Sequence, residues 1–474
     1  MSTDAGRDAV AAPFPESARA ALANDQLRAN IRHATSVIRA RRAEVVAEVP
    51  DWEELREAGR AIKDATLARL DEVLLELEAS VTRAGGVVHW ALDAAEANRI
   101  VVELVRAVGA GEVVKVKSLA TDEIRLNDAL ERAGIEPIET DLAELICQLA
   151  GERPSHLLVP AIHKNRGEIR DLFRERLDLP DLSDDPAELT EAARLHLRAA
   201  FLRARVAISG ANFAVAETGT ICVVESEGNG RMCTTLPETL ITVMGIEKAI
   251  QQWQDLEVLM QLLPRSATGE RMNPYTSLWT GVASGDGPAA FHLVLLDNGR
   301  TRALADPVGR PVLRCIRCSA CLNICPVYRQ TGGHPYHTVY AGPIGAILQP
   351  QLSGERGQPG TLPFASSLCG ACYDVCPVKI DIPSILVHER ARAVAADGSR
   401  LEGLVMRRLA RILLDRRRYE RAQGLGRALQ RPAVRRGRVR WFVGPLRGWG
   451  SSRELPALPS QTFREWWESR ERDA

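Results

Sequence analysis

Seven of the ten cysteines lie between Cys315 and Cys376, in two matching arrays that each end in Cys-Pro. The first array has the spacing C-x2-C-x2-C-x3-C-P and consists of Cys315, Cys318, Cys321 and Cys325. The second has the spacing C-x2-C-x3-C-P and consists of Cys369, Cys372 and Cys376. Ser366 stands where one more cysteine would complete the second match. The chain must therefore fold so that two short thiol-rich loops share one local environment.

The spacing of the first array is that of bacterial ferredoxins, in which the first three cysteines hold one [4Fe–4S] cluster and the fourth reaches the other. Two intervening residues let a tight loop present thiolates to three corners of a cubane, and Pro326 fixes φ where the chain turns away. Cross-ligation predicts that cluster one takes Cys315, Cys318, Cys321 and Cys376. Cluster two then takes Cys325, Cys369 and Cys372, and is one thiolate short. We therefore predict an iron–sulfur protein that passes electrons through two [4Fe–4S] clusters.

The fourth corner of the second cluster is open to three interpretations. Ser366 can ligate through its oxygen, a [3Fe–4S] cluster can form, or an external ligand can fill the corner, although thiolate ligation is the usual kind. A structural zinc site is disfavoured, because zinc needs only four ligands and does not require the C-x2-C-x2-C-x3-C-P spacing. The other cysteines are isolated in apolar contexts, which predicts buried, unreactive thiols at Cys147, Cys222 and Cys233.

The charge of the chain excludes some partners and suggests others. The 61 basic and 61 acidic residues balance, so net charge does not indicate binding to nucleic acid. The sequence has no visible secretory signal and no apolar run of about 18 residues, so we expect a cytoplasmic protein. Residues 401–440 hold 13 Arg and only three acidic residues. This basic region can contact anionic lipid at the inner face of the membrane or an acidic partner, although a solvated face is the commonest use.

The length of 474 residues predicts several domains, and the local patterns suggest where they lie. Strand-like runs at 87–90, 113–116, 157–159 and 221–224 alternate with helical stretches such as 94–108 and 122–133, which predicts βαβ units around a mostly parallel sheet. Residues 52–77 have apolar positions at helical spacing. We expect an N-terminal helical segment at 1–85, an α/β domain at 86–300, a two-cluster domain at 301–395 and a basic helical region at 396–474.

The α/β region offers only weak candidate sites. Lys115 and Lys117, and the polar run at 163–166, lie at the ends of expected strands, where ligands of open α/β sheets bind. Solvated loop charges are nevertheless the preferred interpretation. The turn at 217–220 can bind an anion through backbone N–H groups or be an ordinary turn, and we favour the turn. His388 and Glu389 begin a zinc-hydrolase motif but lack its second histidine.

Short motifs along nearly the whole chain carry a resemblance to a known family. They are 50–56 (PDWEELR), 59–64 (GRAIKD), 89–91 (HWA), 94–98 (AAEAN), 216–220 (AETGT), 314–318 (RCIRC), 332–336 (GGHPY), 340–345 (YAGPIG), 367–372 (SLCGAC) and 460–466 (SQTFREW). In these motifs the chain resembles the lactate-utilisation iron–sulfur protein B family. The seven-cysteine pattern is similar to the family's own, so the missing eighth thiolate is not a local loss.

The resemblance implies more than the spacing does. The α/β region is expected to be a lactate-utilisation (LUD) domain related to a CoA-transferase-like fold, and the cluster region a mainly α-helical, ferredoxin-like domain. The family implies work with two companion subunits, and with electron donor and acceptor proteins, in oxidising L-lactate to pyruvate. Two alternatives remain: a self-contained hydroxy-acid oxidoreductase whose α/β domain binds substrate, and an iron–sulfur module that senses oxygen.

Overall fold

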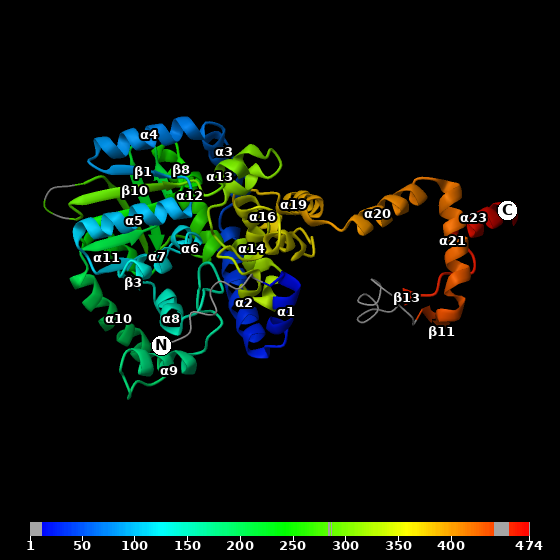
Figure 1. The fold of residues 1–474 in the computed structure, drawn as a ribbon, viewed down its shortest axis with the longest axis horizontal. Coiled ribbons are helices and arrows are strands. Elements are labelled where there is room, and N and C mark those ends of the chain that lie inside the picture. Colours follow the sequence, from blue (N-terminus) through cyan, green and yellow to red (C-terminus); the bar gives the residue numbers. More distant parts are fainter. Residues whose placement is uncertain (1–11, 283–284, 286, 440–454, 474) are drawn as a thin grey trace. The chain divides into compact units, whose positions relative to one another are not determined.

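The computed structural model describes residues 12–282, 285, 287–439 and 455–473. The chain divides into two compact units, Met1–Asp397 and Gly398–Ala474. The first unit contains the α/β region and both cysteine loops, and the second contains the arginine-rich C-terminal region (Figure 1). Within the described residues, the helices fall short of the length and apolarity that a membrane crossing needs.

The centre of the first unit is a six-stranded sheet in which every neighbouring pair is parallel. In spatial order its strands are β1 (Val87–Ala91), β10 (Ala290–Leu296), β7 (Thr239–Gly245), β4 (Val206–Ser209), β2 (Glu112–Lys115) and β3 (Glu136–Glu139). The four residues of β4 and the seven of β7 are all buried, which is expected when helices or a second sheet cover both faces of a parallel sheet. The predicted parallel sheet is therefore confirmed.

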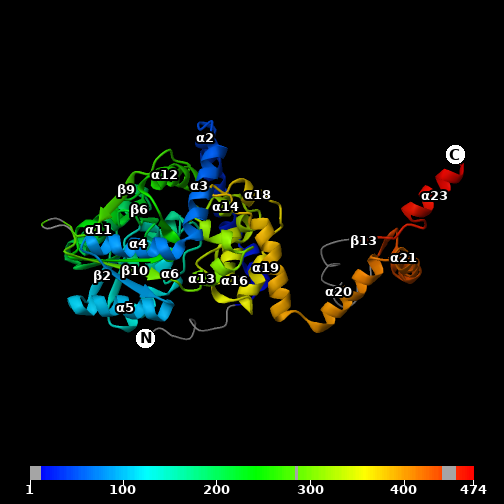
Figure 2. The same ribbon diagram turned by 90° about the horizontal axis from the view of Figure 1, so that it is seen from above.

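Different elements cover the two faces of this sheet (Figure 2). On one face, α5 (Ala94–Val108) and α7 (Leu126–Arg132) form a core with alternate strand residues, such as Val206 and Ile208. Ala207, between them, joins the larger core on the opposite face. That core includes α4 (Leu70–Arg83), α12 (Trp253–Ala267) and a second sheet.

The second sheet is small and mixed. Its strands, in spatial order, are β8 (Ala249–Ile250), β5 (Phe213–Val215), β6 (Thr220–Glu225) and β9 (Tyr275–Thr280). The pairs β5–β6 and β6–β9 are antiparallel, and β5–β8 is parallel. The remaining helical elements of the α/β region are α6 (Leu119–Glu123), α8 (Leu142–Ala150), α9 (Arg166–Arg176), α10 (Pro186–Arg203), α11 (Asn229–Thr235) and η2 (Ile246–Lys248).

The cysteine region, residues 300–397, consists mostly of short helices, because glycine and proline interrupt it repeatedly. They are α13 (Arg300–Ala305), η3 (Arg310–Arg314), α14 (Ala320–Ile324), α15 (Tyr328–Thr331), η4 (His334–Tyr336), α16 (Gly342–Ser353), α17 (Gln358–Thr361), η5 (Leu362–Phe364), α18 (Ala371–Asp374) and α19 (Ile382–Asp397). The most buried of these is α16, and it packs against α13, α14 and α19. This region is helical, as expected for a helical ferredoxin-like domain.

The N-terminal helices pack against the cysteine region, although the two lie far apart in sequence. In chain order they are α1 (Phe14–Leu22), α2 (Asp25–Ala47) and α3 (Trp52–Ala68). The rings of Phe14 in α1 and Tyr336 in η4 have centroids 4.8 Å apart. Helix α2 packs on α14 and α15, and α3 packs on α12 and η3. The helices therefore form one wall of the cysteine region.

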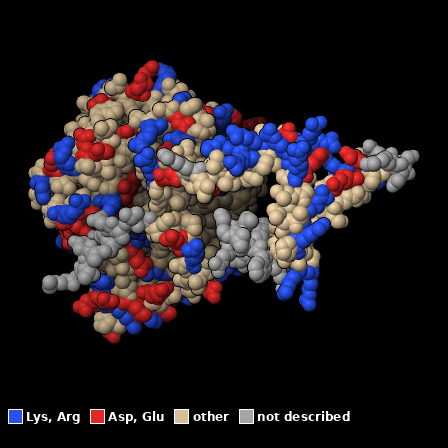
Figure 3. All heavy atoms as spheres, turned by 45° about the vertical axis from the view of Figure 1, so that its right-hand side comes forward, with Lys and Arg blue, Asp and Glu red and all other residues tan. Residues whose placement is uncertain are grey.

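The second unit is described by itself. It contains α20 (Arg400–Leu413), α21 (Arg416–Gln430), η6 (Arg431–Ala433), the antiparallel strands β11 (Val434–Arg435), β12 (Arg438–Val439) and β13 (Leu455–Pro456), and α23 (Phe463–Asp473). Lys and Arg side chains gather over α20 and α21 (Figure 3). In α20, Leu401, Val405 and Leu409 share one helical face, while Arg407 and Arg411 lie on the other.

The helical periodicity predicted over 52–77 is confirmed by two helices, α3 and α4, which are separated by Arg69. Two other local predictions were wrong. The helix expected over 122–133 is broken by Arg125, whose φ of 54° lies in the left-handed region. Residues 157 and 158 form a bend and residue 159 has no regular structure, so the strand expected over 157–159 is absent. The Leu158 carbonyl oxygen accepts a hydrogen bond from the Lys117 ammonium group and not from a neighbouring strand.

Candidate functional site

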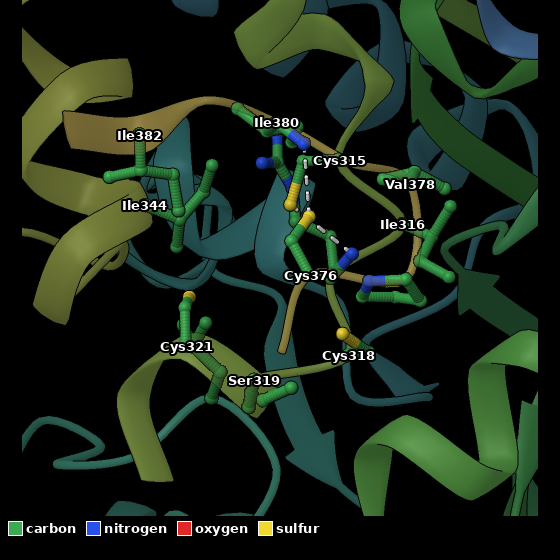
Figure 4. Close-up of a pocket in the computed structure, with 14 residues that line it drawn as sticks. Cys315, Ile316, Cys318, Ser319, Cys321, Ile344, Cys376, Val378, Ile380 and Ile382 are labelled. Carbon is green, nitrogen blue, oxygen red and sulfur yellow. Dashed lines mark hydrogen bonds between the residues drawn. The ribbon is translucent and has the colours of Figure 1, made fainter. Parts of the chain in front are cut away.

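A cavity lies between the two cysteine loops. Its lining includes the thiols of Cys315, Cys318, Cys321 and Cys376. The four labelled cysteines surround one open space in Figure 4, and aliphatic side chains such as Ile344 close its sides. Three of these cysteines come from the first array and one from the second.

A second cavity lies at the other end of the same arrays, and its lining includes Cys325, Cys369, Cys372 and Ser366. Cys369 is exposed, so this cavity reaches the surface, although Cys325 and Cys372 are buried. None of the four cysteines of the first cavity is exposed, but Cys315 and Cys321 are only partly buried. Ser366 is half-buried, and its hydroxyl oxygen accepts a hydrogen bond from the backbone N–H of Leu368.

The structure therefore brings the seven cysteines together in the two groups that cross-ligation predicts. Cys376 joins the first three cysteines of the other array, and Cys325 joins the second array. Ligation of iron by these thiols stays a prediction. The arrangement fits it, because four thiols line the first cavity and three thiols, together with Ser366, line the second.

The backbone of both loops is shaped to point N–H groups at sulfur. Arg317 and Ser319 in the first loop and Leu368 in the second have positive φ values of 62°, 61° and 55°. Such conformations are costly for residues other than glycine and tend to occur at functional sites. The N–H of Arg317 donates to Cys315 Sγ at 3.4 Å, and that of Ile380 donates to Cys376 Sγ at 3.3 Å. Hydrogen bonds of this kind stabilise negative charge on sulfur.

The thiols themselves are unfavourable as isolated anions. Burial raises the pKa of Cys318 and of Cys372 to about 12, and that of Cys376 to about 11. Neighbouring cysteines raise these pKa values further through like-charge repulsion. A positively charged iron centre would relieve both effects, because metal ions stabilise the thiolate form of their ligands. The electrostatics of the site therefore fit an iron–sulfur cluster.

Two arginines from the α2–α3 wall hold the second cysteine loop in place. Arg56 donates to the carbonyl oxygen of Cys376 at 2.9 Å and to that of Tyr373 at 3.1 Å. Arg42 donates to the carbonyl oxygen of Val375 at 3.0 Å. These bonds satisfy buried backbone acceptors and orient the loop so that Cys376 lines the first cavity.

A buried ionic network connects the first loop to the α/β domain. Glu247, in η2 at the end of strand β7, lies 3.0 Å from the Arg317 guanidinium and 2.5 Å from that of Arg300. Arg300 also pairs with Glu123 at 2.9 Å, and Glu123 accepts a hydrogen bond from the Tyr340 hydroxyl at 2.5 Å. The Arg317 guanidinium lies 4.5 Å from the centroid of the Tyr340 ring. The network therefore extends from the sheet to the cysteines.

The network carries a surplus of positive charge. The Lys63 ammonium donates to the backbone carbonyl oxygens of Glu247 and Ala249. Lys63, Arg300 and Arg317 therefore face the carboxylates of Glu123 and Glu247, and Lys248 is a fourth cationic side chain beside them. Burial lowers the pKa of Lys63 to about 8 and that of Lys248 to about 7. The Nη1 atom of Arg317 has no hydrogen-bond partner among the described residues. This positive charge lies beside Cys315, where it would stabilise the reduced, more negatively charged state of a bound cluster. The sequence analysis missed Glu247, whose only signal is an acidic residue two positions after a buried strand.

The weak candidates of the α/β domain have ordinary structural roles. Lys115 is buried and lies 2.9 Å from Glu139 and 3.2 Å from Asp122, so the prediction of a solvated lysine was wrong. The segment at 217–220 is the expected turn, in which the Thr218 hydroxyl donates a hydrogen bond to the Thr220 hydroxyl oxygen. The cysteines outside the arrays are buried as predicted, and burial raises the pKa of Cys222 and of Cys233 to about 12.

Family comparisons agree with these two parts of the molecule. Residues 74–295 match the LUD domain family, and residues 311–380 match the 4Fe-4S dicluster domain family. The second match covers all seven clustered cysteines. Fold and site thus define a LUD-domain iron–sulfur protein.

Relatives over the full length make the assignment more specific. "Lactate utilization protein B 1" of Bacillus mycoides is 40% identical over 461 residues, and covers 96% of each chain. "Lactate utilization protein B" is 42% identical in Oceanobacillus iheyensis, over 94% of each chain, and 41% identical in Shouchella clausii, over 98% of each. The chain belongs to the lactate utilization protein B family, which confirms the resemblance inferred from its motifs.

Among solved structures, a duf162 family protein from Deinococcus radiodurans overlaps 48% of this chain and 98% of its own, with 13% identity and a TM-score of 0.26. An overlap at that TM-score does not bear on the fold.

Proposed function

We propose that this protein is the electron-transferring iron–sulfur subunit of a three-component system that oxidises L-lactate to pyruvate. The observation that carries the proposal is the sorting of seven cysteines into two neighbouring cavities. The names of the relatives point to lactate as the substrate of the pathway. Two companion subunits, with an electron donor and an electron acceptor, would complete the system.

The ligands proposed for the first cluster are Cys315, Cys318, Cys321 and Cys376, and those for the second are Cys325, Cys369 and Cys372. A bound [4Fe–4S] cluster supplies a one-electron carrier whose potential depends on charge, burial and hydrogen bonds to sulfur. The protein supplies those conditions. Aliphatic side chains line the first cavity, and backbone N–H groups of Arg317 and Ile380 donate hydrogen bonds to the sulfurs of Cys315 and Cys376.

The charges favour the first cavity as the site of higher potential. Its loop contacts the Arg317–Glu247–Arg300 network, with its surplus of buried positive charge. The second cavity includes exposed Cys369, and water there would screen charge. The cluster in the first cavity would therefore be reduced in preference to the cluster in the second.

Three finer assignments belong to the same proposal. The four-part organisation 1–85, 86–300, 301–395 and 396–474 is retained, and the α/β part is proposed to be CoA-transferase-like, which its parallel sheet with covered faces supports. Peripheral contact with the inner face of the membrane is proposed for α20, because its apolar and arginine-rich faces suit an anionic lipid surface. Flotation with vesicles of anionic lipid tests that contact, and the substitution Val405→Asp on the apolar face of α20 should weaken it.

The test begins with iron and acid-labile sulfide measured on anaerobically purified protein, followed by EPR after dithionite reduction. Two clusters predict about eight iron and eight sulfide per chain with interacting signals. Cys318→Ser should remove the first signal and Cys372→Ser the second, whereas Cys222→Ser, a buried thiol outside both cavities, should change neither. Zinc in place of iron would contradict the proposal. So would the loss of the same EPR signal in Cys318→Ser and Cys372→Ser.

A second measurement tests the relay role. Isothermal titration of the isolated chain with L-lactate should show no heat of specific binding, because the substrate is expected to bind a companion subunit. Specific binding, together with reduction of the clusters by lactate in the absence of companions, would instead identify a self-contained oxidoreductase.

A further inference from the structure

One group of metal-ligand side chains lies outside both cysteine cavities. Asp306 is in the segment between α13 and η3, and His388 and Glu389 are neighbours in α19. One ligand atom from each of the three lies within 4.8 Å of the others. The first residue precedes the first cysteine array in the chain and the other two follow the second array. The group therefore joins the two ends of the cysteine region.

The carboxylate of Glu389 is in an unusual environment. Its side chain is completely buried, and neither of its oxygens has a hydrogen-bond partner among the described residues. The nearest cation is the Arg392 guanidinium, whose Nη1 atom lies 3.8 Å from Glu389 Oε1. A buried carboxylate without hydrogen bonds is strongly unfavourable, because nothing replaces the water it has lost. Such an orphaned group indicates a missing cationic partner.

The neighbouring groups do not supply that partner. Asp306 Oδ1 accepts hydrogen bonds from the N–H groups of Val308 and Gly309, while its Oδ2 lies 2.8 Å from His388 Nε2. Arg392 contacts Asp306 Oδ2 at 2.5 Å and also pairs with Glu355.

The carboxylates around this point outnumber the guanidinium groups that pair with them. Those of Asp306, Glu355 and Glu389 share the guanidinium of Arg392. Of the three, Glu389 is the one whose oxygens have no hydrogen-bond partner among the described residues.

We propose that Asp306, His388 and Glu389 bind a divalent metal ion. The donor set is one imidazole nitrogen and two carboxylate oxygens, which suits Zn²⁺ or Mn²⁺ better than metals that prefer soft thiolate ligands. With bonds of about 2.0–2.2 Å, ligand atoms around a tetrahedral ion lie about 3.3 Å apart, so the three groups need to approach by only about 1.5 Å. Arg392 retains Glu355 as its partner when the metal takes Asp306 Oδ2.

The position of the ion gives it a structural role. It fastens α19 to the segment that leads into the first array, and α19 also carries Leu386, which lines the second cavity one turn before Glu389. The ion thereby holds the helix that borders the second cavity in place. It takes no part in electron transfer.

The test uses anaerobic full-length protein with intact clusters, verified by iron and sulfide content, after passage over a chelating resin. Mn²⁺ alone is the probe, because it has little affinity for thiolates, and loss of the EPR signal of free hydrated Mn²⁺ measures binding. Glu389→Gln and His388→Gln remove one ligand each. His163→Gln is the matched control, because His163 forms a 2.8 Å pair with Glu152 but belongs to no three-ligand group among the described residues.

The expected result is one Mn²⁺ per chain in the wild type and in His163→Gln, displaced by Zn²⁺, with at least tenfold weaker binding in both ligand variants. If Glu389→Gln does not fold, His388→Gln decides, since its side chain is partly exposed. Absence of binding in the wild type, or equal binding in wild type and His388→Gln, overturns the proposal.

Discussion

Glu247 is the anion on which the network beside the first cavity depends. Its two oxygens bind Arg300 and Arg317, and its side chain is 1% exposed. The substitution Glu247→Gln keeps the shape of the side chain but removes the charge. Two buried guanidinium groups then share one neutral acceptor, and breaking a buried ion pair from one side typically costs about 3–5 kcal/mol.

This cost can be converted into a melting temperature. Unfolding entropy is about 2.1 cal/mol/K per residue, so the unit Met1–Asp397 unfolds with about 0.8 kcal/mol/K. The thermal midpoint of Glu247→Gln should therefore fall by about 4–6 °C. Anaerobic far-UV circular dichroism, with cluster content checked by absorbance, measures this fall.

A matched exposed pair provides the control. Glu238 lies 3.0 Å from Arg205, and both side chains are more than half exposed. Glu238→Gln should lower stability by less than about 1 kcal/mol, because surface ion pairs contribute little. Equal shifts in the two variants would refute the reasoning that the Glu247 network lies in a low-dielectric interior. A second readout is independent of stability: loss of the Glu247 charge should raise the reduction potential of the first cluster.

The remaining predictions concern the clusters and pH. Arg317→Gln removes a positive charge beside Cys315 and should lower one of the two reduction potentials in an EPR-monitored titration. A unit charge about 10 Å from a redox centre, at a dielectric constant of about 20, contributes about 1.7 kcal/mol, or about 70 mV for one electron. If both potentials are unchanged, the network does not act on the first cluster. Ser366→Cys should slow the bleaching of cluster absorbance in air, whereas exposed Ser384→Cys should not. Burial lowers the pKa of His156 to about 4, so the unfolded chain binds the proton more readily and stability falls as pH drops from about 6.5 towards 4. At pH 5.5 this loss is about 1.4 kcal/mol, and urea unfolding at pH 7.5 and 5.5 should show a smaller difference in His156→Gln.

The grouping of the cysteines was predictable because ligand spacing is a local property. Residues two or three positions apart in a tight loop must face one centre, so Cys315, Cys318 and Cys321 line one cavity in any compact arrangement. The helix at 94–108 was also predictable, since an aspartate cap precedes its apolar stripe and Gly109 ends it in the left-handed conformation.

The charged groups were not predictable in the same way. Lys115 resembles a loop lysine in sequence, and only the parallel pairing of β2 with β3 places Glu139 beside it. Glu247 meets Arg300 and Arg317 across sequence separations of 53 and 70 positions. Each is an ordinary charged residue when considered alone, and the network exists only after the sheet and the cysteine region have packed together.

The bonds from Arg56 to the second cysteine loop have a consequence for the making of this protein. Arg56 and Cys376 are separated by 320 positions, so this contact closes a very long loop and must come late in folding. A ribosome releases Cys376 only after the whole α/β domain has emerged. Cys315, Cys318 and Cys321 also emerge after that domain, and they lack their fourth companion until the segment up to Cys376 has been made. A complete ligand set for the first cavity therefore exists only after the α/β domain has been synthesised, and a cellular assembly factor would encounter a chain that already contains this domain.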